Sequence, residues 1–219
     1  MLLVCTGNIC RSALAERLGR AYLDELLGKD ARAIRLVSAG TRAVVGSEMH
    51  PDSALVLLGL GAEPGDFRAR QLVDVHAAEA DLTLTMTREH RRDVLALAPR
   101  ALARTFTLRE AAALVGLVDE DAELLGDDPG DRARNLVQKM AAARSRRHGG
   151  EGDDIEDPIG RPVDVQAEVG NAISEALLPV LRRFAALLRA GDARPAGRAG
   201  PVGMRDSSSP SGDGASRVS

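Results

Sequence analysis

Aromatic side chains are scarce in this chain, at 2% of its 219 residues, and tryptophan is absent. Its core must therefore consist mainly of leucine, valine and alanine. The two cysteines are too few for a disulfide-stabilised scaffold and fit a reducing compartment. No stretch approaches the roughly 20 apolar residues of a membrane span, and the first apolar run, Leu2–Val4, is too short for a secretory signal. We therefore expect a cytoplasmic protein.

Charge of one sign is also lacking, because the formal net charge is only −3. Such a balance gives no electrostatic basis for binding nucleic acid or an anionic membrane, so neither is expected as a partner. No metal or other cofactor is expected, since the histidines show no close ligand spacing. These are His50, His76, His90 and His148.

Length and composition predict one domain, 1–190, followed by a tail. Hydrophobic residues make up 44% of the chain and charged residues 28%, which is typical of a soluble globular protein. The tail, 191–219, is rich in Gly, Ala, Pro, Ser and Arg, and we expect it to be disordered. Within the domain, 117–150 is a candidate helical insertion with an arginine-rich helix over 131–147. That helix is either a solvated face balanced by acidic neighbours or a docking surface for an acidic partner.

The most informative motif lies at the N-terminus, where an apolar strand leads into the loop Cys5–Ser12 and then into a helical pattern. Arg11 follows Cys5 by six positions, which lets the loop curl into a bowl lined by backbone N–H groups. Such a bowl at a helix N-terminus suits a tetrahedral dianion. Arg11 can bind two phosphate oxygens, and Cys5 would lie beneath the phosphorus as a nucleophile. The amides, the helix and the arginine all favour the thiolate form.

Other residues of the loop have expected roles. Gly7 allows close approach of the backbone to the ligand, and Asn8 tolerates a positive φ. Ser12 can donate a hydrogen bond to the sulfur, while Ser38 either supports Asn8 or simply forms a turn. Cys10 is either a redox partner of Cys5 or a small buried residue. The expected phosphate-binding residues are Thr6, Gly7, Asn8, Ile9, Cys10, Arg11 and Ser12.

Alternating strand and helix patterns predict a parallel sheet that is covered on both faces. Strands are expected at 1–4, 34–38, 80–86 and 101–106. Helices are expected at 12–28, 51–60, 88–97 and 165–188, the last with a kink or break near Pro179. The bowl would then lie at the carboxyl end of the first strand, where open α/β sheets bind their ligands.

The segment Val4–Ser12, VCTGNICRS, resembles the phosphate-binding loop of the low-molecular-weight protein tyrosine phosphatases. Landmarks similar to the family's follow at 38–41, 68–72 and 80–82, and the resemblance covers roughly 1–188. It implies an α/β three-layer sandwich with a central four-stranded parallel sheet and the phosphate-binding loop after the first strand. The implied partner is a phosphorylated protein, of which a tyrosine kinase is one candidate.

Asp157-Pro158 resembles the late Asp-Pro element that carries the family's general acid. A carboxylic acid above the bowl can protonate the leaving oxygen and then activate water to break a cysteinyl-phosphate. The resemblance thus implies phosphotyrosine hydrolysis, with Cys5, Arg11 and Asp157 as catalytic residues. Asp154 is the fallback candidate for the acid.

Two departures from the family pattern leave alternatives open. Ile159-Gly160 replaces the aromatic residues common after the Asp-Pro, as in the protein-arginine phosphatase branch of the family, whereas Ile9 favours the tyrosine phosphatases. Phe67 stands where many members have a histidine. An arsenate reductase would need further cysteines for a disulfide relay, which disfavours it. The alternative that is not an enzyme is a phosphate-binding module that keeps the bowl but has lost turnover.

Overall fold

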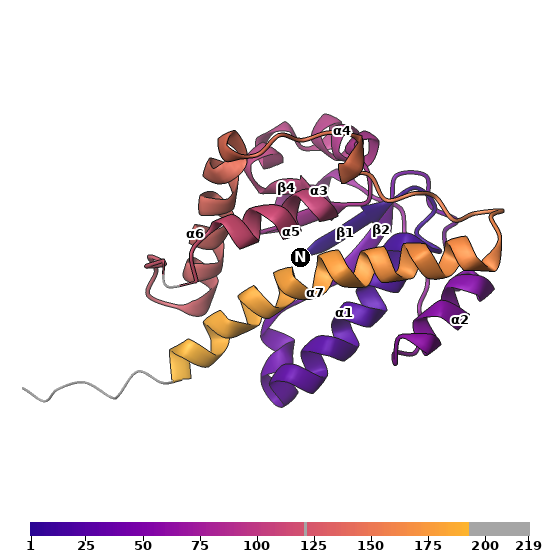
Figure 1. Ribbon diagram of the computed structural model, residues 1–219, viewed down its shortest axis with the longest axis horizontal. Coiled ribbons are helices and arrows are strands. Elements are labelled where there is room, and N and C mark those ends of the chain that lie inside the picture. Colours follow the sequence, from indigo (N-terminus) through magenta and orange to yellow (C-terminus); the bar gives the residue numbers. More distant parts are fainter. Residues whose placement is uncertain (121, 193–219) are drawn as a thin grey trace, which may run out of the picture.

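The protein's computed structural model describes residues 1–120 and 122–192, with a parallel sheet at its centre (Figure 1). The sheet has four strands in the order β2-β1-β3-β4. Leu3 of the first strand lies opposite Ser38 on one side and Leu84 on the other. The predicted four-stranded parallel α/β fold is therefore confirmed. The strands are β1 (Leu2–Cys5), β2 (Val37–Gly40), β3 (Thr83–Thr85) and β4 (Thr105–Thr107).

Helices cover both faces of the sheet, which gives three layers. The side chains of β1 alternate between two apolar clusters: Leu3 and Cys5 join the larger one, Leu2 and Val4 the smaller. In the larger cluster α7 packs against both α1 and α5 (Figure 1). The smaller cluster lies under α3 and α4. The helices are α1 (Arg11–Leu27), α2 (Pro51–Gly59), α3 (Asp74–Glu79), α4 (Arg88–Leu97), α5 (Leu108–Leu117), α6 (Pro129–Ala142) and α7 (Val163–Asp192).

Two predicted strands were misplaced. The segment expected as the fourth strand, 101–106, is mostly the 3-10 helix Pro99–Arg104, and β4 is only Thr105–Thr107. Proline at the first position of this turn presets a helical φ, and only the Thr-Phe-Thr that follows has strong β-propensity. The second strand lies at Val37–Gly40 rather than 34–38, because Ile34 terminates another 3-10 helix, Gly28–Ala33. The third strand is shorter than predicted.

The last helix continues through Pro179, so the expected break there was wrong. Proline removes one backbone hydrogen bond, but its neighbours Leu177, Val180 and Leu181 are fully buried, and their packing stabilises the helix on both sides. Gly19 of α1 makes this packing close, since a Cβ there would lie 2.6 Å from the Leu36 side chain and 3.0 Å from that of Leu181. The helix extends to Asp192, and most of the predicted tail, 193–219, lies outside the described residues.

The arginine-rich helix forms, but as α6 over Pro129–Ala142 with a 3-10 turn, Ala143–Arg146, instead of one helix over 131–147. Its arginines bind groups of the same chain: Arg134 pairs with Asp131, Arg144 with Glu110 and Arg147 with Asp153. These contacts favour an internally balanced surface over a docking site. None of the helices in the described ranges is long and apolar enough to cross a membrane.

Phe106, at the centre of β4, is the one aromatic side chain that is completely buried among the described residues. The guanidinium of Arg144 lies over its ring, 4.1 Å from the centroid. We expect Phe106→Ala to lower the free energy of unfolding by about 3–5 kcal/mol through the cavity it leaves. Urea denaturation measures this. As a control, Leu102→Ala at an exposed site should change stability by no more than about 0.5 kcal/mol, and equal effects would contradict the packing described here.

Candidate functional site: an anion-binding loop at the end of β1

The loop between β1 and α1 is held by hydrogen bonds to five of its carbonyl groups, which point outward. In a trans peptide the C=O and the following N–H point in opposite directions. The N–H groups of residues 6, 7, 8, 10 and 11 therefore point to the inside of the loop, as a bowl for an anion requires. The carbonyl oxygens of Cys5, Thr6, Gly7, Ile9 and Cys10 accept hydrogen bonds from the N–H groups of Thr41, Arg42, Val44, His50 and Leu14 respectively.

Gly40, the last residue of β2, allows this close approach. A Cβ on Gly40 would lie 2.4 Å from the carbonyl oxygen of Thr6 and 3.0 Å from the backbone nitrogen of Asn8. Both neighbours are backbone atoms of the loop, so a side chain at position 40 would displace the loop itself. Sequence reasoning did not single out this glycine, although it belongs to one of the landmark segments.

Asn8 fixes the shape of the bowl from within. It has φ of 54°, the only positive φ of a non-glycine residue in the described ranges, and its side chain is completely buried. Its Oδ1 must be the atom facing the backbone N–H of Arg70, 2.8 Å away, because an N–H can only donate. Its Nδ2 therefore donates to Ser12 Oγ at 2.9 Å and to Ser38 Oγ at 2.7 Å.

The hydrogen bonds from Asn8 direct both serine protons. Ser38 Oγ donates to Glu16 Oε2 at 2.7 Å, so its lone pair accepts from Asn8. Ser12 Oγ also accepts from Asn8, which leaves its own proton for Cys5 Sγ, 2.9 Å away. The expected support of Asn8 by Ser38 is thus present. Glu16, whose side chain lies 3.5 Å from Arg70, completes the network and was missed by sequence reasoning.

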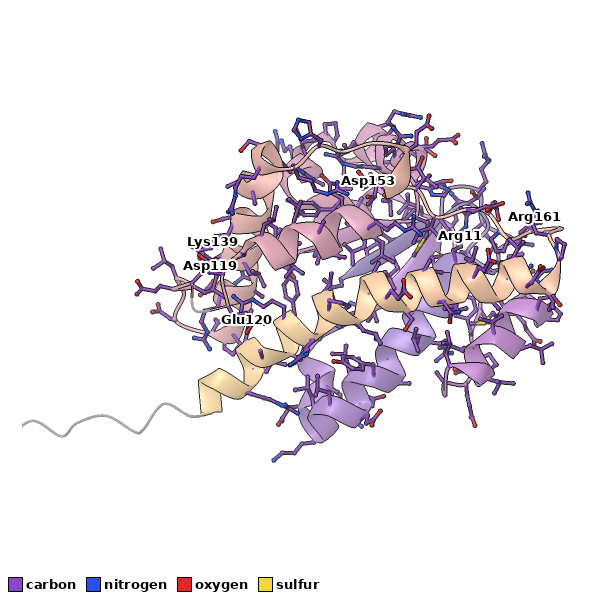
Figure 2. All side chains as sticks on the ribbon, in the orientation of Figure 1. Arg11, Asp119, Glu120, Lys139, Asp153 and Arg161 are labelled. Atoms are coloured by element: carbon purple, nitrogen blue, oxygen red, sulfur yellow. The ribbon has the colours of Figure 1, made fainter. Side chains whose placement is uncertain are left out.

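Arg11 joins the bowl to the segment that precedes α7 (Figure 2). Its guanidinium is 4% exposed and lies 2.7 Å from Asp157 Oδ2, and it donates to the carbonyl oxygen of Ile155 at 3.0 Å. The backbone N–H of Ile155 in turn donates to the carbonyl oxygen of Met86, next to the end of β3. The structure thus brings Asp157 to the bowl. Its carboxylate is half exposed and therefore accessible to water.

The other carboxylates near Asp157 are bound elsewhere. Asp154 accepts hydrogen bonds from the backbone and the side chain of Arg88 at the start of α4, so the fallback candidate does not face the bowl. Asp153 is buried against Arg147, and that hydrogen-bonded guanidinium lowers the pKa of the carboxyl group. Among the carboxylates of 153–157, the structure pairs only Asp157 with Arg11.

Cys10 is a buried thiol that contacts Ser53. Burial raises the pKa of Cys10 to about 11, which keeps the group protonated at neutral pH. Cys5 and Cys10 are both free in this structure. In the described part of the chain, no three His, Cys, Asp or Glu side chains are grouped as a metal site.

His90 binds the loop from α4 and was also missed by sequence reasoning. Its Nε2 lies 2.8 Å from Thr6 Oγ1, and its Nδ1 lies 2.9 Å from the Oγ1 of Thr87, the N-cap of α4. Burial, and secondarily the nearby guanidinium of Arg11, lowers the pKa of His90 to about 4. The imidazole is therefore neutral at physiological pH.

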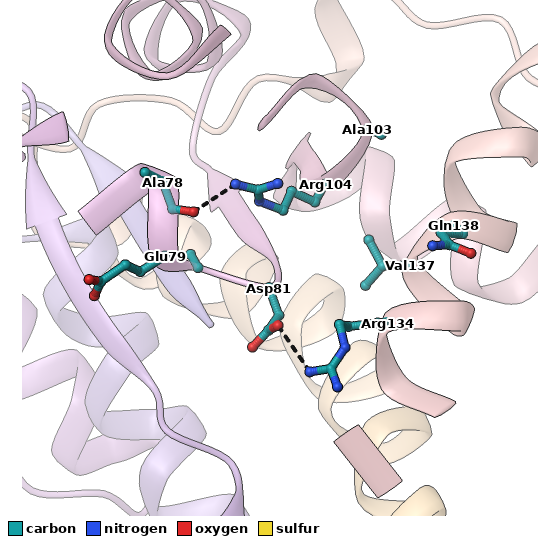
Figure 3. A pocket seen from close by; sticks show the side chains of 9 residues that line it. Ala78, Glu79, Asp81, Ala103, Arg104, Arg134, Val137 and Gln138 are labelled. Atoms are coloured by element: carbon teal, nitrogen blue, oxygen red, sulfur yellow. Dashed lines mark hydrogen bonds and ion pairs between the residues drawn. The ribbon is translucent and has the colours of Figure 1, made fainter. Parts of the chain in front are cut away.

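A separate cavity of about 350 Å³ lies between α6 and the segment that joins α3 to β3 (Figure 3). Three of its charged groups are already bound: Arg104 donates to the carbonyl oxygen of Ala78 at 2.7 Å, and Arg134 lies 3.5 Å from Asp81. Asp81 precedes β3 and Arg104 precedes β4, so the cavity lies at the amino end of these strands, opposite the bowl.

Comparison with known proteins gives a consistent picture. A family model described as low molecular weight phosphotyrosine protein phosphatase matches residues 1–129, which include the bowl but not Asp157. The low molecular weight protein-tyrosine-phosphatase Etp of Escherichia coli (strain K12) is 34% identical over 105 residues, 48% of this chain and 66% of that protein. The protein-arginine-phosphatase of Geobacillus stearothermophilus is 36% identical over 110 residues, 50% of this chain and 69% of that protein.

Solved structures extend the likeness to most of the fold. The low molecular weight protein tyrosine phosphatase from T. tengcongensis has a TM-score of 0.59 at 27% identity and covers 83% of this chain and 97% of its own. The YwlE arginine phosphatase from Geobacillus stearothermophilus has a TM-score of 0.58 at 26% identity and covers 90% of this chain and 97% of its own.

Substitution of Gly40 tests whether the bowl depends on the close approach of β2. We expect Gly40→Ala to lower kcat/KM for an aryl phosphate at least tenfold and to destabilise the fold by about 1–3 kcal/mol, as overpacking does. Gly59→Ala is the matched control, because a Cβ there meets nothing within 4 Å. Steady-state kinetics and urea denaturation on both variants measure these effects. Wild-type activity in Gly40→Ala would contradict the geometry.

The acid sensitivity of the fold tests the neutral state of His90. Its pKa is about 4 in the folded protein, whereas histidine in an unfolded chain has a pKa of about 6.5. As the pH falls, the unfolded state therefore binds the proton first. Protonation of His90 in the unfolded state should therefore lower the free energy of unfolding by about 3 kcal/mol as the pH falls from 6.5 to 4. It should have no effect above pH 7. Urea denaturation at several pH values would show a flatter dependence for His90→Gln than for wild type. Parallel curves would contradict the assignment.

Proposed function

The chain belongs to the low molecular weight phosphotyrosine protein phosphatase family, a family of phosphomonoester hydrolases, and from this we propose that it hydrolyses phosphotyrosine in proteins through a cysteinyl-phosphate intermediate. One observation carries the proposal. The carboxylate of Asp157 lies 2.7 Å from the guanidinium of Arg11, and Arg11 belongs to the same loop as the buried Cys5. A candidate acid that is distant in sequence thus lies beside the loop that contains the candidate nucleophile and the anion-binding arginine.

In the first step the Cys5 thiolate attacks phosphorus, and an S–P bond forms as the bond from phosphorus to the tyrosine oxygen breaks. The inward N–H groups and Arg11 stabilise the charge on the phosphoryl oxygens. Asp157, protonated, gives its proton to the leaving phenolate oxygen, so that tyrosine departs as a neutral phenol.

In the second step Asp157, now a carboxylate, takes a proton from a water molecule that attacks phosphorus. The S–P bond breaks, inorganic phosphate forms and the thiolate of Cys5 is regenerated. The hydroxyl of Ser12, directed at Cys5 by Asn8, donates to the departing sulfur and lowers its basicity. Every step uses groups of this chain and water.

Phosphoarginine is the second candidate substrate, because one relative matched over half of this chain is a protein-arginine-phosphatase. The apolar Ile159, which is half exposed two positions after Asp157, is followed by Gly160 as in the protein-arginine phosphatase branch, and this pattern favours phosphoarginine. Ile9 favours phosphotyrosine, which we keep as the first candidate. With only two cysteines, both in the bowl, the chain cannot relay a disulfide to a third cysteine. A phosphate-binding module without turnover would keep the bowl but show no hydrolysis.

Leaving-group dependence tests the roles of Cys5 and Asp157. Cys5→Ser should abolish turnover. Asp157→Asn should lower kcat/KM by about 10²–10⁴-fold for phenyl phosphate, whose leaving oxygen needs a proton. The loss should be smaller for para-nitrophenyl phosphate, because nitrophenolate departs without protonation. The assay is steady-state hydrolysis with EDTA present, and we expect EDTA to leave the activity unchanged.

Asp154→Asn is the matched control and should retain most activity, because that carboxylate binds Arg88. Equal losses on both leaving groups in Asp157→Asn would remove Asp157 as the acid. If the folded, reduced wild-type protein shows no turnover, the catalytic proposal fails and a phosphate-binding module becomes the remaining interpretation. Phosphotyrosine and phosphoarginine peptides, compared by kcat/KM, then separate the two substrate classes.

A further inference from the structure

The contact between His90 and Thr6 links the first turn of α4 to the residue that directly follows Cys5. The two atoms are 2.8 Å apart, and the imidazole is 5% exposed. Among the described residues, no other side-chain hydrogen bond joins the loop to α4. Asn8, in contrast, is held from the side of β2 and α1. Its function is not explained by the steps proposed above.

The position of Thr87 favours one direction for the protons of this link. As the N-cap of α4, its Oγ1 accepts the backbone N–H of His90 at 3.2 Å. Its hydroxyl proton can then go to His90 Nδ1, 2.9 Å away, which satisfies the hydroxyl as acceptor and as donor. With Nδ1 as the acceptor, a neutral imidazole carries its proton on Nε2 and donates it to Thr6 Oγ1. The hydroxyl proton of Thr6 is then available to a ligand.

Thr6 is held at both ends of the residue. Its carbonyl oxygen accepts from Arg42 N at 3.0 Å, and its side chain meets His90. Arg11 and Asp157 both act electrostatically on the imidazole, which therefore belongs to the environment of the bowl. A fixed Thr6 keeps the N–H of Gly7 pointing inward before any anion arrives, and such preorganised donors need no rearrangement at the moment of reaction.

We propose that His90 is a positioning residue, which through the contact of its Nε2 with Thr6 holds the bowl in its anion-binding shape. The proposal deepens the proposed function and rests on it for the effect on turnover. The effect on anion binding does not depend on turnover, because the bowl binds phosphate by its geometry alone.

Two conservative variants separate this role from a purely structural one. Asparagine at position 90 carries its amide near the place of Nδ1 and can keep the contact with Thr87. Glutamine carries its amide near the place of Nε2 and can keep the contact with Thr6. A positioning role predicts that His90→Gln retains activity while His90→Asn loses it. A role only in capping α4 predicts the reverse order.

The experiment measures kcat/KM for para-nitrophenyl phosphate and the dissociation constant of inorganic phosphate for wild type, His90→Gln, His90→Asn, His90→Ala and His50→Ala. We expect about a tenfold loss in both quantities for His90→Ala and His90→Asn, which corresponds to one lost hydrogen bond of about 1.4 kcal/mol. His90→Gln should stay within about threefold of wild type. His50, the N-cap of α2, is the control for removing a helix-capping histidine, because its contact with the loop is made by the backbone N–H, which His50→Ala keeps.

A double-mutant cycle with Thr6→Val completes the test. If His90 acts through Thr6, then Thr6→Val and His90→Ala together should weaken phosphate binding no more than Thr6→Val alone. Additive losses, or better activity in His90→Asn than in His90→Gln, would overturn the proposal. If wild type binds phosphate but does not turn over, the proposed function fails, while the binding measurements still decide the role of His90.

Discussion

The site depends on a line of hydrogen bonds that runs beneath the bowl from Glu16 through Ser38 and Asn8 to Ser12 and Cys5. Asn8 adopts a left-handed backbone conformation that costs free energy for any residue with a side chain, and its buried amide would cost more if left unpaired. Each polar group of that amide has a partner, so the strained loop is stable in this one shape. The proton of Ser12 is directed at the sulfur as a result.

The fold supplies these partners because β1, β2 and the first turns of α1 lie next to one another at the carboxyl end of the sheet. β1 carries Cys5, β2 carries Ser38, and α1 returns across them with Glu16 in its second turn. Parallel strands bring their carboxyl ends together, so the site requires no unusual connection. On the other side, Ile155 is bound to Met86 beyond β3, and this contact places Asp157 above the loop although it is remote in sequence.

The residues of the bowl and the four-stranded sheet could be predicted because both have short-range signals. The spacing of Cys5 and Arg11 between an apolar strand and a helix is local, and so is the alternation of strand and helix. The supporting residues could not be found in this way. Glu16 and His90 occupy ordinary helical positions, and Gly40 resembles many other glycines. Their importance comes from contacts between distant segments, which no local pattern reports.

The two main errors in the predicted elements have different causes. The segment 101–106 has an apolar composition that suits a buried strand, yet Pro99 begins a 3-10 turn and leaves only Thr105–Thr107 for the sheet. In α7, the break expected at Pro179 does not occur, because the burial of Leu177, Val180 and Leu181 stabilises the helix on both sides. Tertiary packing thus outweighed a local preference in α7, whereas at 101–106 a local signal, Pro99, outweighed the apolar composition.

The ion pair between Arg11 and Asp157 means that the protein carries its own competitor for the anion site. In the ligand-free protein the guanidinium is already paired with a carboxylate, which an incoming phosphoryl group has to displace. The side chain can pair with Arg11 again as the product leaves, once it has lost the proton taken up in the second step. Asp157 would then have a third part besides the two proton transfers proposed for it. By pairing with Arg11 again it would help to release inorganic phosphate, and so limit product inhibition.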